Sequence, residues 1–344
     1  MRPNIFDYAT SELSQDAFLA WYCRWADETM TDDMELHTNA RAFLKKYIAI
    51  QQPDYNEEIR TVKVEKQHKY IDVFLKINDN LSVIIEDKVN TGQHSNQLER
   101  YKEAIKGRKV MLYVKTGDES LKRQREVETK EYIVIDRASL LQDLEMCKSE
   151  SEIFVSFIER LRKKEDETHT YRESNVWNTA QVIGFYKDME QVLPNSNWSH
   201  VDNPNKGSYV LNWLWLQLPE CRIYLEFSFP CWCATNERPY LRNFKLLVKI
   251  TADAEPEDKR ERLAFRQRLM YQHTKAFVKH ANGLVYRPTK LRTGRYMTIA
   301  EVGCEQFIKD SASINIQQIA EKLGPYEEAA RSYAEMHSSE EERC

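Results

Sequence analysis

The chain has no apolar run that approaches the ~20 residues of a membrane-spanning helix. The N-terminal segment also lacks the unbroken apolar core of a secretory signal, because Asp7 and Glu12 fall where that core would lie. Hydrophobic residues make up 42% of the 344 residues and charged residues 30%, as in a folded globular protein. We therefore expect a cytoplasmic protein without a membrane partner and long enough for two domains.

Cysteine offers little for cross-linking or metal binding. The seven cysteines are odd in number and follow no paired spacing: Cys23, Cys147, Cys221, Cys231, Cys233, Cys304 and Cys344. Cys231 and Cys233 have no second pair nearby that would complete a zinc site. We expect reduced thiols and no cysteine-bound metal.

The chain also lacks an excess of positive charge, since its formal net charge is −4 at pH 7. Affinity for nucleic acid must therefore come from a local patch rather than from the whole surface. One such patch lies between residues 259 and 295, where Glu261 is the only acid. The bases of this patch are Lys259, Arg260, Arg262, Arg266, Arg268, Lys275, Lys279, Arg287, Lys290, Arg292 and Arg295.

Part of this patch has helical spacing. Arg262 and Arg266 are four residues apart, as are Lys275 and Lys279, so each pair shares a helix face. A basic face with an apolar reverse suits a helix that follows phosphates, so we predict contact with DNA or RNA. The alternatives are a solvated basic face or one that docks on acidic helices of the same chain.

Two apolar segments joined by a polar turn lie in the N-terminal half. Residues 70–77 and 81–89 are rich in β-branched and apolar residues, and the intervening residues 78–80 are Asn, Asp and Asn. This pattern predicts two antiparallel strands with a tight connection. The charged residues of this hairpin are the ones that suggest chemistry.

Asp72 lies on the first of these strands, and Glu86, Asp87 and Lys88 lie on the second. Side chains alternate along a strand, so Glu86 and Lys88 share one face and Asp87 takes the other. The hairpin brings Asp72 close to Glu86, and two converging carboxylates suit Mg²⁺ or Mn²⁺. A lysine beside that cation can position a water and stabilise charge on a phosphate. We interpret the set as a phosphodiester-cleaving site; the alternative is a hairpin with solvated charges.

The flanking segments predict an ordered α/β domain. Helical spacing marks residues 13–25 and the segment from Gln93 to Lys106, and strand patterns mark residues 61–65, 109–114 and 132–135. The expected order is helix, three strands, helix, strand, helix, strand. Within the second helix, Gln97 and Tyr101 lie four residues apart and share a face.

These residues and this order resemble the PD-(D/E)XK nuclease superfamily, with Asp72, Glu86 and Lys88 at its signature positions. Gln97 to Tyr101 resembles the Gln-x-x-x-Tyr helix motif of the RecB-like branch, and residues 6–18 resemble the start of little-characterised bacterial members. The resemblance implies a restriction-endonuclease-like αβββαβ core.

This chain departs from the superfamily pattern at two positions. Ile71 replaces the proline of the name, and Asp87 stands where an apolar residue is usual. The second departure leaves open whether Asp87 faces solvent or helps to hold the metal. An acid on the first helix often completes the metal site in the superfamily, and Glu12 matches that position.

The composition changes near residues 163–174, where a charged stretch ends a helix. We place the nuclease domain at residues 1–165 and a second domain at residues 175–344. In the second domain we expect helices at 176–193, 256–280 and 314–336, and strands at 209–216, 222–227, 244–250 and 296–302. This order is typical of an α+β domain with an antiparallel sheet that binds substrate or a partner.

The resemblance thus implies a Mg²⁺- or Mn²⁺-dependent nuclease, most readily a DNase. Asp72 and Glu86, with the backbone carbonyl of Asp87, would hold the metal, and Glu12 would bind it directly or through water. Lys88 would orient the attacking water and offset charge in the transition state. The resemblance to bacterial members suggests a role in DNA repair or in defence against foreign DNA, such as anti-phage defence.

Gln97 and Tyr101 would position the scissile strand or Lys88. Two other interpretations stay open. One is a catalytically silent nuclease-fold subunit that binds nucleic acid or protein, and the other is an RNase gated by a ligand or partner. The sequence leaves a homo-oligomer and a regulatory protein partner open as well.

Overall fold

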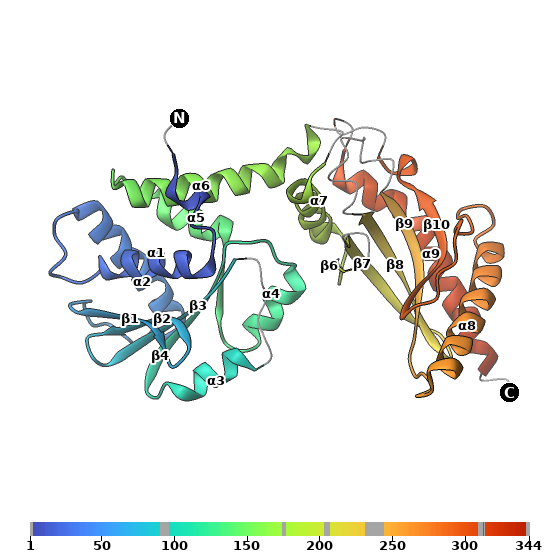
Figure 1. Ribbon diagram of the computed structural model, residues 1–344, viewed down its shortest axis with the longest axis horizontal. Helices are drawn as coiled ribbons and strands as arrows, with labels where there is room; N and C mark the ends of the chain where they lie inside the picture. The colour runs from blue at the N-terminus through green and yellow to red at the C-terminus, as the bar shows by residue number, and fades with distance from the viewer. Residues whose placement is uncertain are drawn as a thin grey trace. The chain divides into compact units, whose positions relative to one another are not determined.

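The computed structural model describes residues 3–89, 96–173, 177–202, 207–230, 244–308, 312 and 314–341. The chain divides into two compact units, Met1–Asp166 and Glu167–Cys344. Each unit has its own five-stranded sheet (Figure 1). Helix α6 (Glu152–His169) runs across the division between the two units.

The first unit is built on a mixed sheet of order β1-β2-β3-β4-β5. Strands β1, β2 and β3 pair antiparallel, and β3, β4 and β5 pair parallel. Along the chain its elements are η1 (Ile5–Asp7), α1 (Glu12–Arg24), α2 (Met34–Gln51), β1 (Val62–His68), β2 (Ile71–Ile77), β3 (Leu81–Lys88), α3 (Gln97–Ala104), β4 (Arg108–Lys115), α4 (Leu121–Glu128), β5 (Ile133–Asp136), α5 (Arg137–Glu145) and α6.

Helices cover both faces of this sheet (Figure 1). Helices α1, α2, α5 and α6 pack on one face, and α3 and α4 pack on the other. Along β3, Val83 and Ile85 belong to the first core and Ile84 to the second. By the same alternation, Asp87 points toward α1, while Glu86 and Lys88 point to the opposite face.

The expected order of elements was incomplete, because it omitted α2 and α5. Helix α2 begins after Asp33, whose carboxylate accepts hydrogen bonds from the backbone N–H groups of Glu35 and Leu36. Its buried residues, which include Leu36, Ala40, Phe43 and Leu44, recur at helical spacing. The apolar period and the cap were both visible in the sequence.

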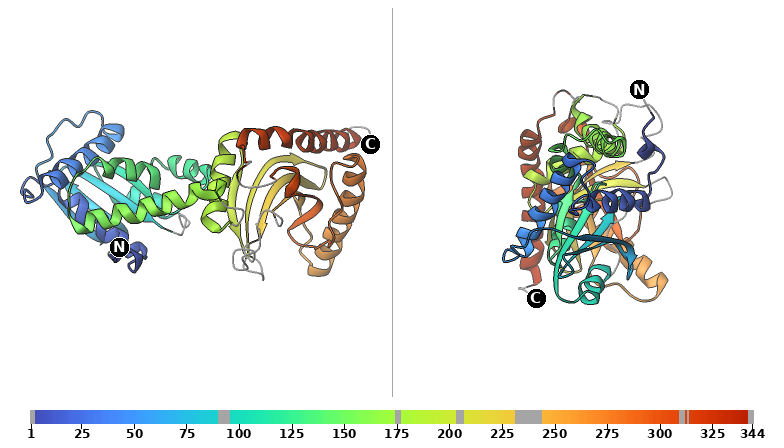
Figure 2. Two further views of the ribbon diagram at one scale, coloured as in Figure 1. Left: turned by 90° about the horizontal axis from the view of Figure 1, so that it is seen from above. Right: turned by 90° about the vertical axis from the view of Figure 1, so that its left-hand side faces the viewer.

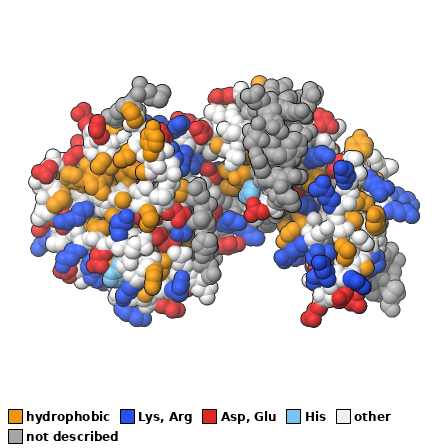
Figure 3. All heavy atoms as spheres, in the orientation of Figure 1, with side chains coloured by type: hydrophobic (Ala, Val, Ile, Leu, Met, Phe, Trp, Pro, Cys, Tyr) orange, Lys and Arg blue, Asp and Glu red, His pale blue; other side chains and the backbone are white. Residues whose placement is uncertain are grey.

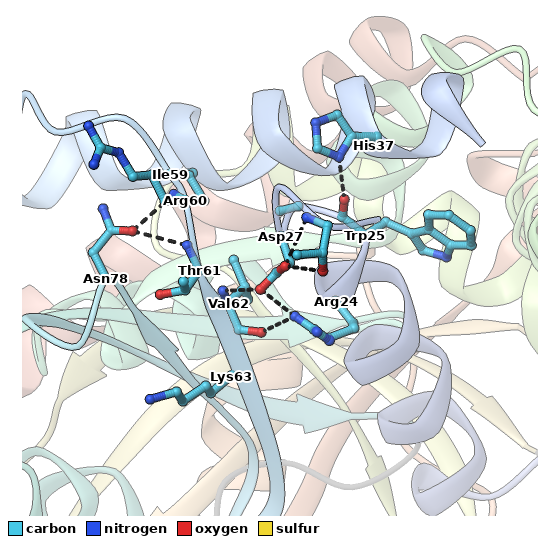
Figure 4. A network of polar contacts seen from close by, with 12 residues as sticks. Arg24, Trp25, Asp27, His37, Ile59, Arg60, Thr61, Val62, Lys63 and Asn78 are labelled. Carbon is cyan, nitrogen blue, oxygen red and sulfur yellow. Dashed lines mark hydrogen bonds and ion pairs between the residues drawn. The ribbon is translucent and has the colours of Figure 1, made fainter. Parts of the chain in front are cut away.

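Polar contacts hold the end of α1 against β1 (Figure 4). The Asp27 carboxylate accepts a hydrogen bond of 2.8 Å from the Val62 backbone N–H, and it also binds Thr29. Arg24 donates to the Val62 carbonyl at 2.6 Å and pairs with Asp27 at 2.5 Å. Burial opposes ionisation of Asp27, but these hydrogen bonds outweigh it and lower its pKa to about 2. They anchor α1, which carries Glu12 at its other end.

The second unit has an antiparallel sheet of order β10-β9-β8-β7-β6, as expected. Its elements are η2 (Thr170–Arg172), α7 (Thr179–Val192), β6 (Asn197–Val201), β7 (Ser208–Gln217), β8 (Cys221–Pro230), β9 (Lys245–Ala252), α8 (Lys259–His280), β10 (Tyr296–Gly303), η5 (Cys304–Gln306) and α9 (Ile316–Glu341). Figure 2 shows α9 lying along one face of the sheet. The expectation omitted the edge strand β6.

Several expected boundaries of the second unit moved, and the starts of two helices show why. Helix α7 was expected from Val176, which lies outside the described residues, and it begins at Thr179 after an Asn178 capping box. Helix α8 begins at Lys259, after Asp258 caps it, rather than at Pro256. Both helices start where a side chain satisfies the first backbone N–H groups.

Two backbone features of the second unit depend on particular residues. A Cβ at Gly184 would lie 1.8 Å from the Thr168 carbonyl oxygen, so only glycine lets α7 approach this closely. Strand β7 has an irregular register between Trp213 and Leu216, and Leu214 there adopts a φ of 56°. A bulky residue in this conformation costs on the order of 1–3 kcal/mol.

None of the helices in the described parts of the chain combines the length and apolarity needed to cross a lipid bilayer.

Candidate active site

The Lys88 ammonium lies among three carboxylates at the end of β3. Its Nζ is 2.6 Å from Oε1 of Glu86, 3.6 Å from Oδ2 of Asp72 and 4.0 Å from Oε2 of Glu12. The Lys88 side chain is 6% exposed, and Nζ also donates a hydrogen bond of 2.9 Å to the Asp87 carbonyl. The structure therefore brings together Glu12, Asp72, Glu86 and Lys88, the charged side chains expected to form the site.

Each carboxylate is placed by a different element. The pairing of Val73 with Ile85 in the β2–β3 hairpin sets Asp72 opposite Glu86. Oδ2 of Asp72 accepts a hydrogen bond of 3.0 Å from the Asp87 backbone N–H, which fixes the carboxylate against β3. Glu12 opens α1, and its Oε1 accepts a hydrogen bond of 3.2 Å from the Val89 backbone N–H.

The site carries more negative charge than Lys88 alone can balance. Glu86 is fully buried, and burial, followed by repulsion from Asp72, raises its pKa to about 8 against the pull of Lys88. Burial alone would lower the pKa of Lys88, but Glu86, Asp72 and Glu12 raise it above its ordinary value. Lys88 thus stays charged, and a further cation would relieve the remaining repulsion.

The donor set suits a hard divalent cation. Oε2 of Glu86 is buried and accepts no hydrogen bond from the described residues. Carboxylate oxygens of this kind are the ligands of Mg²⁺ and Mn²⁺. Among the described residues, however, no three His, Cys, Asp or Glu side chains already form a metal cage. The Lys88 ammonium lies between the acids, so it has to move for a cation to bind them.

Gln97 and Tyr101 lie on α3 and bind to each other. Gln97 Nε2 donates to Tyr101 Oη at 2.7 Å, and Tyr101 Oη donates to the Tyr70 carbonyl at 2.5 Å. These contacts tie α3 to the residue that precedes β2. In the described contacts neither side chain hydrogen-bonds to Lys88. The expected start of this helix at Gln93 lies outside the described residues.

Asp87 belongs to a second polar cluster on the α1 face of β3. Its Oδ1 accepts a hydrogen bond from Gln15 Nε2, and Oε1 of the same side chain accepts one of 2.5 Å from the Thr116 hydroxyl. Burial and then Asp16 raise the pKa of Asp87 well above its usual range. Burial and then Asp72 raise the pKa of Asp16 to about 6. The Asp87 side chain therefore neither faces solvent nor joins the carboxylates around Lys88.

Gln15, Asp16 and Lys115 were not predicted from the sequence as residues near the site. Gln15 and Asp16 follow Glu12 at three and four residues, a helical spacing that would have revealed them. Lys115 is 2% exposed, pairs with Lys88 in the parallel β3–β4 register and donates a hydrogen bond of 3.1 Å to the Val89 carbonyl. Only the pairing of β3 with β4 identifies Lys115.

The predicted basic residues of α8 are only partly available. Arg266 makes two hydrogen bonds to the Glu255 carboxylate, at 2.7 and 2.5 Å. Arg262 donates to the backbone carbonyl of Glu257 at 3.2 Å. Lys275 and Lys279 are exposed. Of these four predicted phosphate contacts, the two exposed ones therefore lie in the last two turns of the helix.

Comparison with known families decides what the first unit resembles. Residues 3–173 match the family model described as the PD-(D/E)XK nuclease superfamily. The match supports assigning the first unit to the PD-(D/E)XK nuclease superfamily. No curated protein and no solved structure matches the chain.

The PD-(D/E)XK assignment suggests nuclease activity and a divalent metal for the first unit. The matched residues include the whole of the cluster around Lys88 and end just beyond α6. The second unit, from α7 onward, lies outside the match.

Proposed function

We propose that this chain is a Mg²⁺- or Mn²⁺-dependent nuclease that hydrolyses phosphodiester bonds, with DNA as the expected polymer. The observation that supports this most directly is the Lys88 ammonium within 4.0 Å of three carboxylates at the end of β3. Burying such charges costs several kcal/mol for each ion before any compensation. A protein that only binds nucleic acid does not need these converging charges and would avoid the free-energy cost of burying them.

The proposed roles follow from the contacts. Asp72 and Glu86, with the backbone carbonyl of Asp87, would bind the divalent cation, and Glu12 would bind it directly or through a water. A bound cation of this kind polarises a phosphodiester and lowers the pKa of its water. Lys88, displaced from between the acids, would orient the attacking water and offset charge on the phosphate.

Gln97 and Tyr101 would hold the scissile strand or steer Lys88 once Lys88 has moved. Their hydrogen bonds to each other and to the Tyr70 carbonyl fix Tyr101 at the entrance to β2. Lys275 and Lys279 of α8 would add phosphate contacts. The resemblance to bacterial members leads us to propose defence against foreign DNA, or repair, as the context.

One experiment tests the proposal. The purified protein is incubated with circular DNA, linear DNA, single-stranded DNA and RNA, each with Mg²⁺, Mn²⁺ or EDTA. We expect cleavage of DNA that needs the metal and disappears in Lys88→Ala. If only RNA is cleaved, the protein is an RNase and not a DNase. Absence of cleavage of every polymer by folded protein would support a silent binding subunit.

A further inference from the structure

The second unit exposes aromatic rings on the sheet face that points away from α9. Trp213 and Leu225 pair across β7 and β8 and belong to the apolar core, and the Trp213 indole donates to Glu327 of α9 at 2.8 Å. Tyr224, next to Leu225, therefore points to the opposite face. This second face is the one that Figure 2, left, shows turned away from α9.

Three rings meet on this face. The Trp215 and Tyr224 rings stack with centroids 3.9 Å apart and planes at 11°, and Tyr296 meets Tyr224 edge-on at 6.4 Å. Tyr224 is 2% exposed, whereas Trp215 is 40% exposed and Tyr296 is 47% exposed. The buried ring thus supports two rings that face solvent.

The bulge in β7 produces this arrangement. Trp213 and Leu216 both pair with core residues of β8, Leu225 and Ile223, so two residues lie between two inward positions. Regular alternation after Trp213 would have turned Trp215 into the core. The extra residue, with Leu214 at a φ of 56°, turns Trp215 outward instead.

Guanidinium groups accompany the exposed rings. The Arg222 guanidinium lies 5.4 Å from the centroid of Trp215, and that of Arg295 lies 5.5 Å from the centroid of Tyr296. We call these five residues the aromatic–arginine cluster: Trp215, Tyr224, Tyr296, Arg222 and Arg295. Arg222 also pairs with Asp253 at 3.1 Å, which holds its planar group in place.

Positive charge leads into this cluster. The segment that precedes β10 contains no acid and exposes four cations, which are Arg287, Lys290, Arg292 and Arg295. Among the described residues none of the four forms an ion pair, in contrast to Arg266 and Arg268 of α8, which bind Glu255 and Glu220. Figure 3 shows Lys and Arg side chains gathered with hydrophobic ones over the α8 side of this unit.

We propose that the aromatic–arginine cluster is a binding site for the unpaired bases of single-stranded nucleic acid. Bases stack on exposed aromatic rings and guanidinium planes, while nearby cations meet the phosphates. A duplex hides its base faces, so the site selects single strands. Stacking does not read the sugar, so single-stranded DNA and RNA both bind. The site goes beyond the proposed nuclease and does not require its activity.

The test measures binding to the full chain in EDTA, so that metal-dependent cleavage cannot alter the result. Fluorescence anisotropy follows labelled oligothymidylate, oligouridylate and a duplex of equal length. Trp215→Ala weakens binding of both single strands by about tenfold, the scale expected when one base no longer stacks on a ring. Trp215→Phe retains most of the affinity. Tyr271→Ala, which removes an exposed ring of α8, leaves it unchanged.

A second arm separates stacking from charge. Replacing Lys290 and Arg292, which lie outside the cluster, together by Ala lowers the slope of log affinity against log salt by about 0.7 for each phosphate that the protein no longer neutralises. Trp215→Ala lowers affinity at every salt concentration and keeps the slope. Thermal unfolding confirms that each variant is folded.

Three results would overturn the proposal. The first is wild-type affinity in both Trp215→Ala and Tyr296→Ala, and the second is failure of the folded chain to bind either oligonucleotide. The third is duplex binding as tight as single-strand binding with the same decreases in the variants. Because binding is measured without metal, none of these results depends on whether the first unit cleaves.

Discussion

The end of β3 and the helix α8 are both rich in charged side chains, but the two regions differ in the burial and pairing of these side chains. Around Lys88, charged side chains from β2, β3 and α1 converge, and Glu86 is fully buried. On α8 the charges are exposed or paired with acids nearby in the chain, as Arg266 is with Glu255. Water screens the second set, whereas Glu86 and Lys88 of the first are largely shielded from it.

This difference shows why charge density along a sequence does not locate a reactive site. Exposed pairs such as Arg268 with Glu220 contribute about 1 kcal/mol or less. Burial, reinforced by the nearby Asp72 carboxylate, raises the pKa of both Glu86 and Asp16. Perturbed pKa values of this kind mark the cluster around Lys88, rather than α8, as the candidate reactive site.

The largest expected effect comes from the two carboxylates that face each other. Glu86→Gln and Asp72→Asn should abolish cleavage, because each removes a metal ligand while keeping shape and hydrogen bonding. Glu86→Gln should preserve or raise the melting temperature of the metal-free protein, since it removes a carboxylate that resists ionisation. Cleavage assays and thermal unfolding in EDTA measure both. Asp79→Asn, in the turn of the same hairpin, is the control, and activity in both variants would refute the assignment.

A smaller decrease in cleavage rate is expected when Lys88 is replaced. Lys88→Ala should lower the cleavage rate by roughly two or more orders of magnitude, the scale of a positioned electrostatic or acid–base group. Affinity for uncleaved DNA, measured without metal, should change little because the Lys88 side chain is only 6% exposed. Lys76→Ala on β2 serves as the matched control. Equal decreases of affinity and rate would make Lys88 a phosphate anchor.

A substitution next to the opposite face of β3, at Asp16, should change the stability of the protein rather than the cleavage rate. The folded pKa of Asp16, about 6, lies above its ordinary value of 3.8. The stability linked to its proton is therefore fully present below about pH 4 and is lost as pH rises toward 6. Asp16→Asn should remove this pH dependence and stabilise the metal-free protein by about 1–2 kcal/mol at pH 7.

Denaturant unfolding of wild type and Asp16→Asn across this pH range measures that difference. Cleavage by the variant should stay within a few-fold of wild type, because its side chain lies on the α1 face of the sheet. A decrease in rate as large as that of Lys88→Ala would show that both faces of β3 act in the reaction.

The smallest effect is expected on α8. Lys275→Glu with Lys279→Glu should weaken duplex binding a few-fold and flatten its salt dependence by about 0.9 for each phosphate left without a cation. The fold should be unchanged because both side chains are exposed. Salt-dependent anisotropy measures the slope. Normal binding with loss of an oligomer or a protein partner would assign this face to assembly.

Local pattern was sufficient for much of the first unit. The hairpin of β2 and β3 was predicted because its strands are adjacent in the chain and a period of two determines which side chains share a face. That local geometry already brings Asp72, Glu86 and Lys88 together. Strand β6 (Asn197–Val201) was not predicted, because its five residues carry little local strand signal and, among the described strands, pair only with β7.

The sequence by itself determined the acid–acid–lysine set, because a hairpin and its alternation are local properties. The tertiary structure decided which distant groups surround that set. It placed Glu12 beside Val89, Lys115 beside Lys88, and Asp87 against α1 rather than in solvent. It also turned Trp215 outward through a bulge. The contacts of Glu12, Lys115 and Asp87 join residues far apart in the chain. Their energies come from burial and pairing that exist only once the sheets and helices have packed.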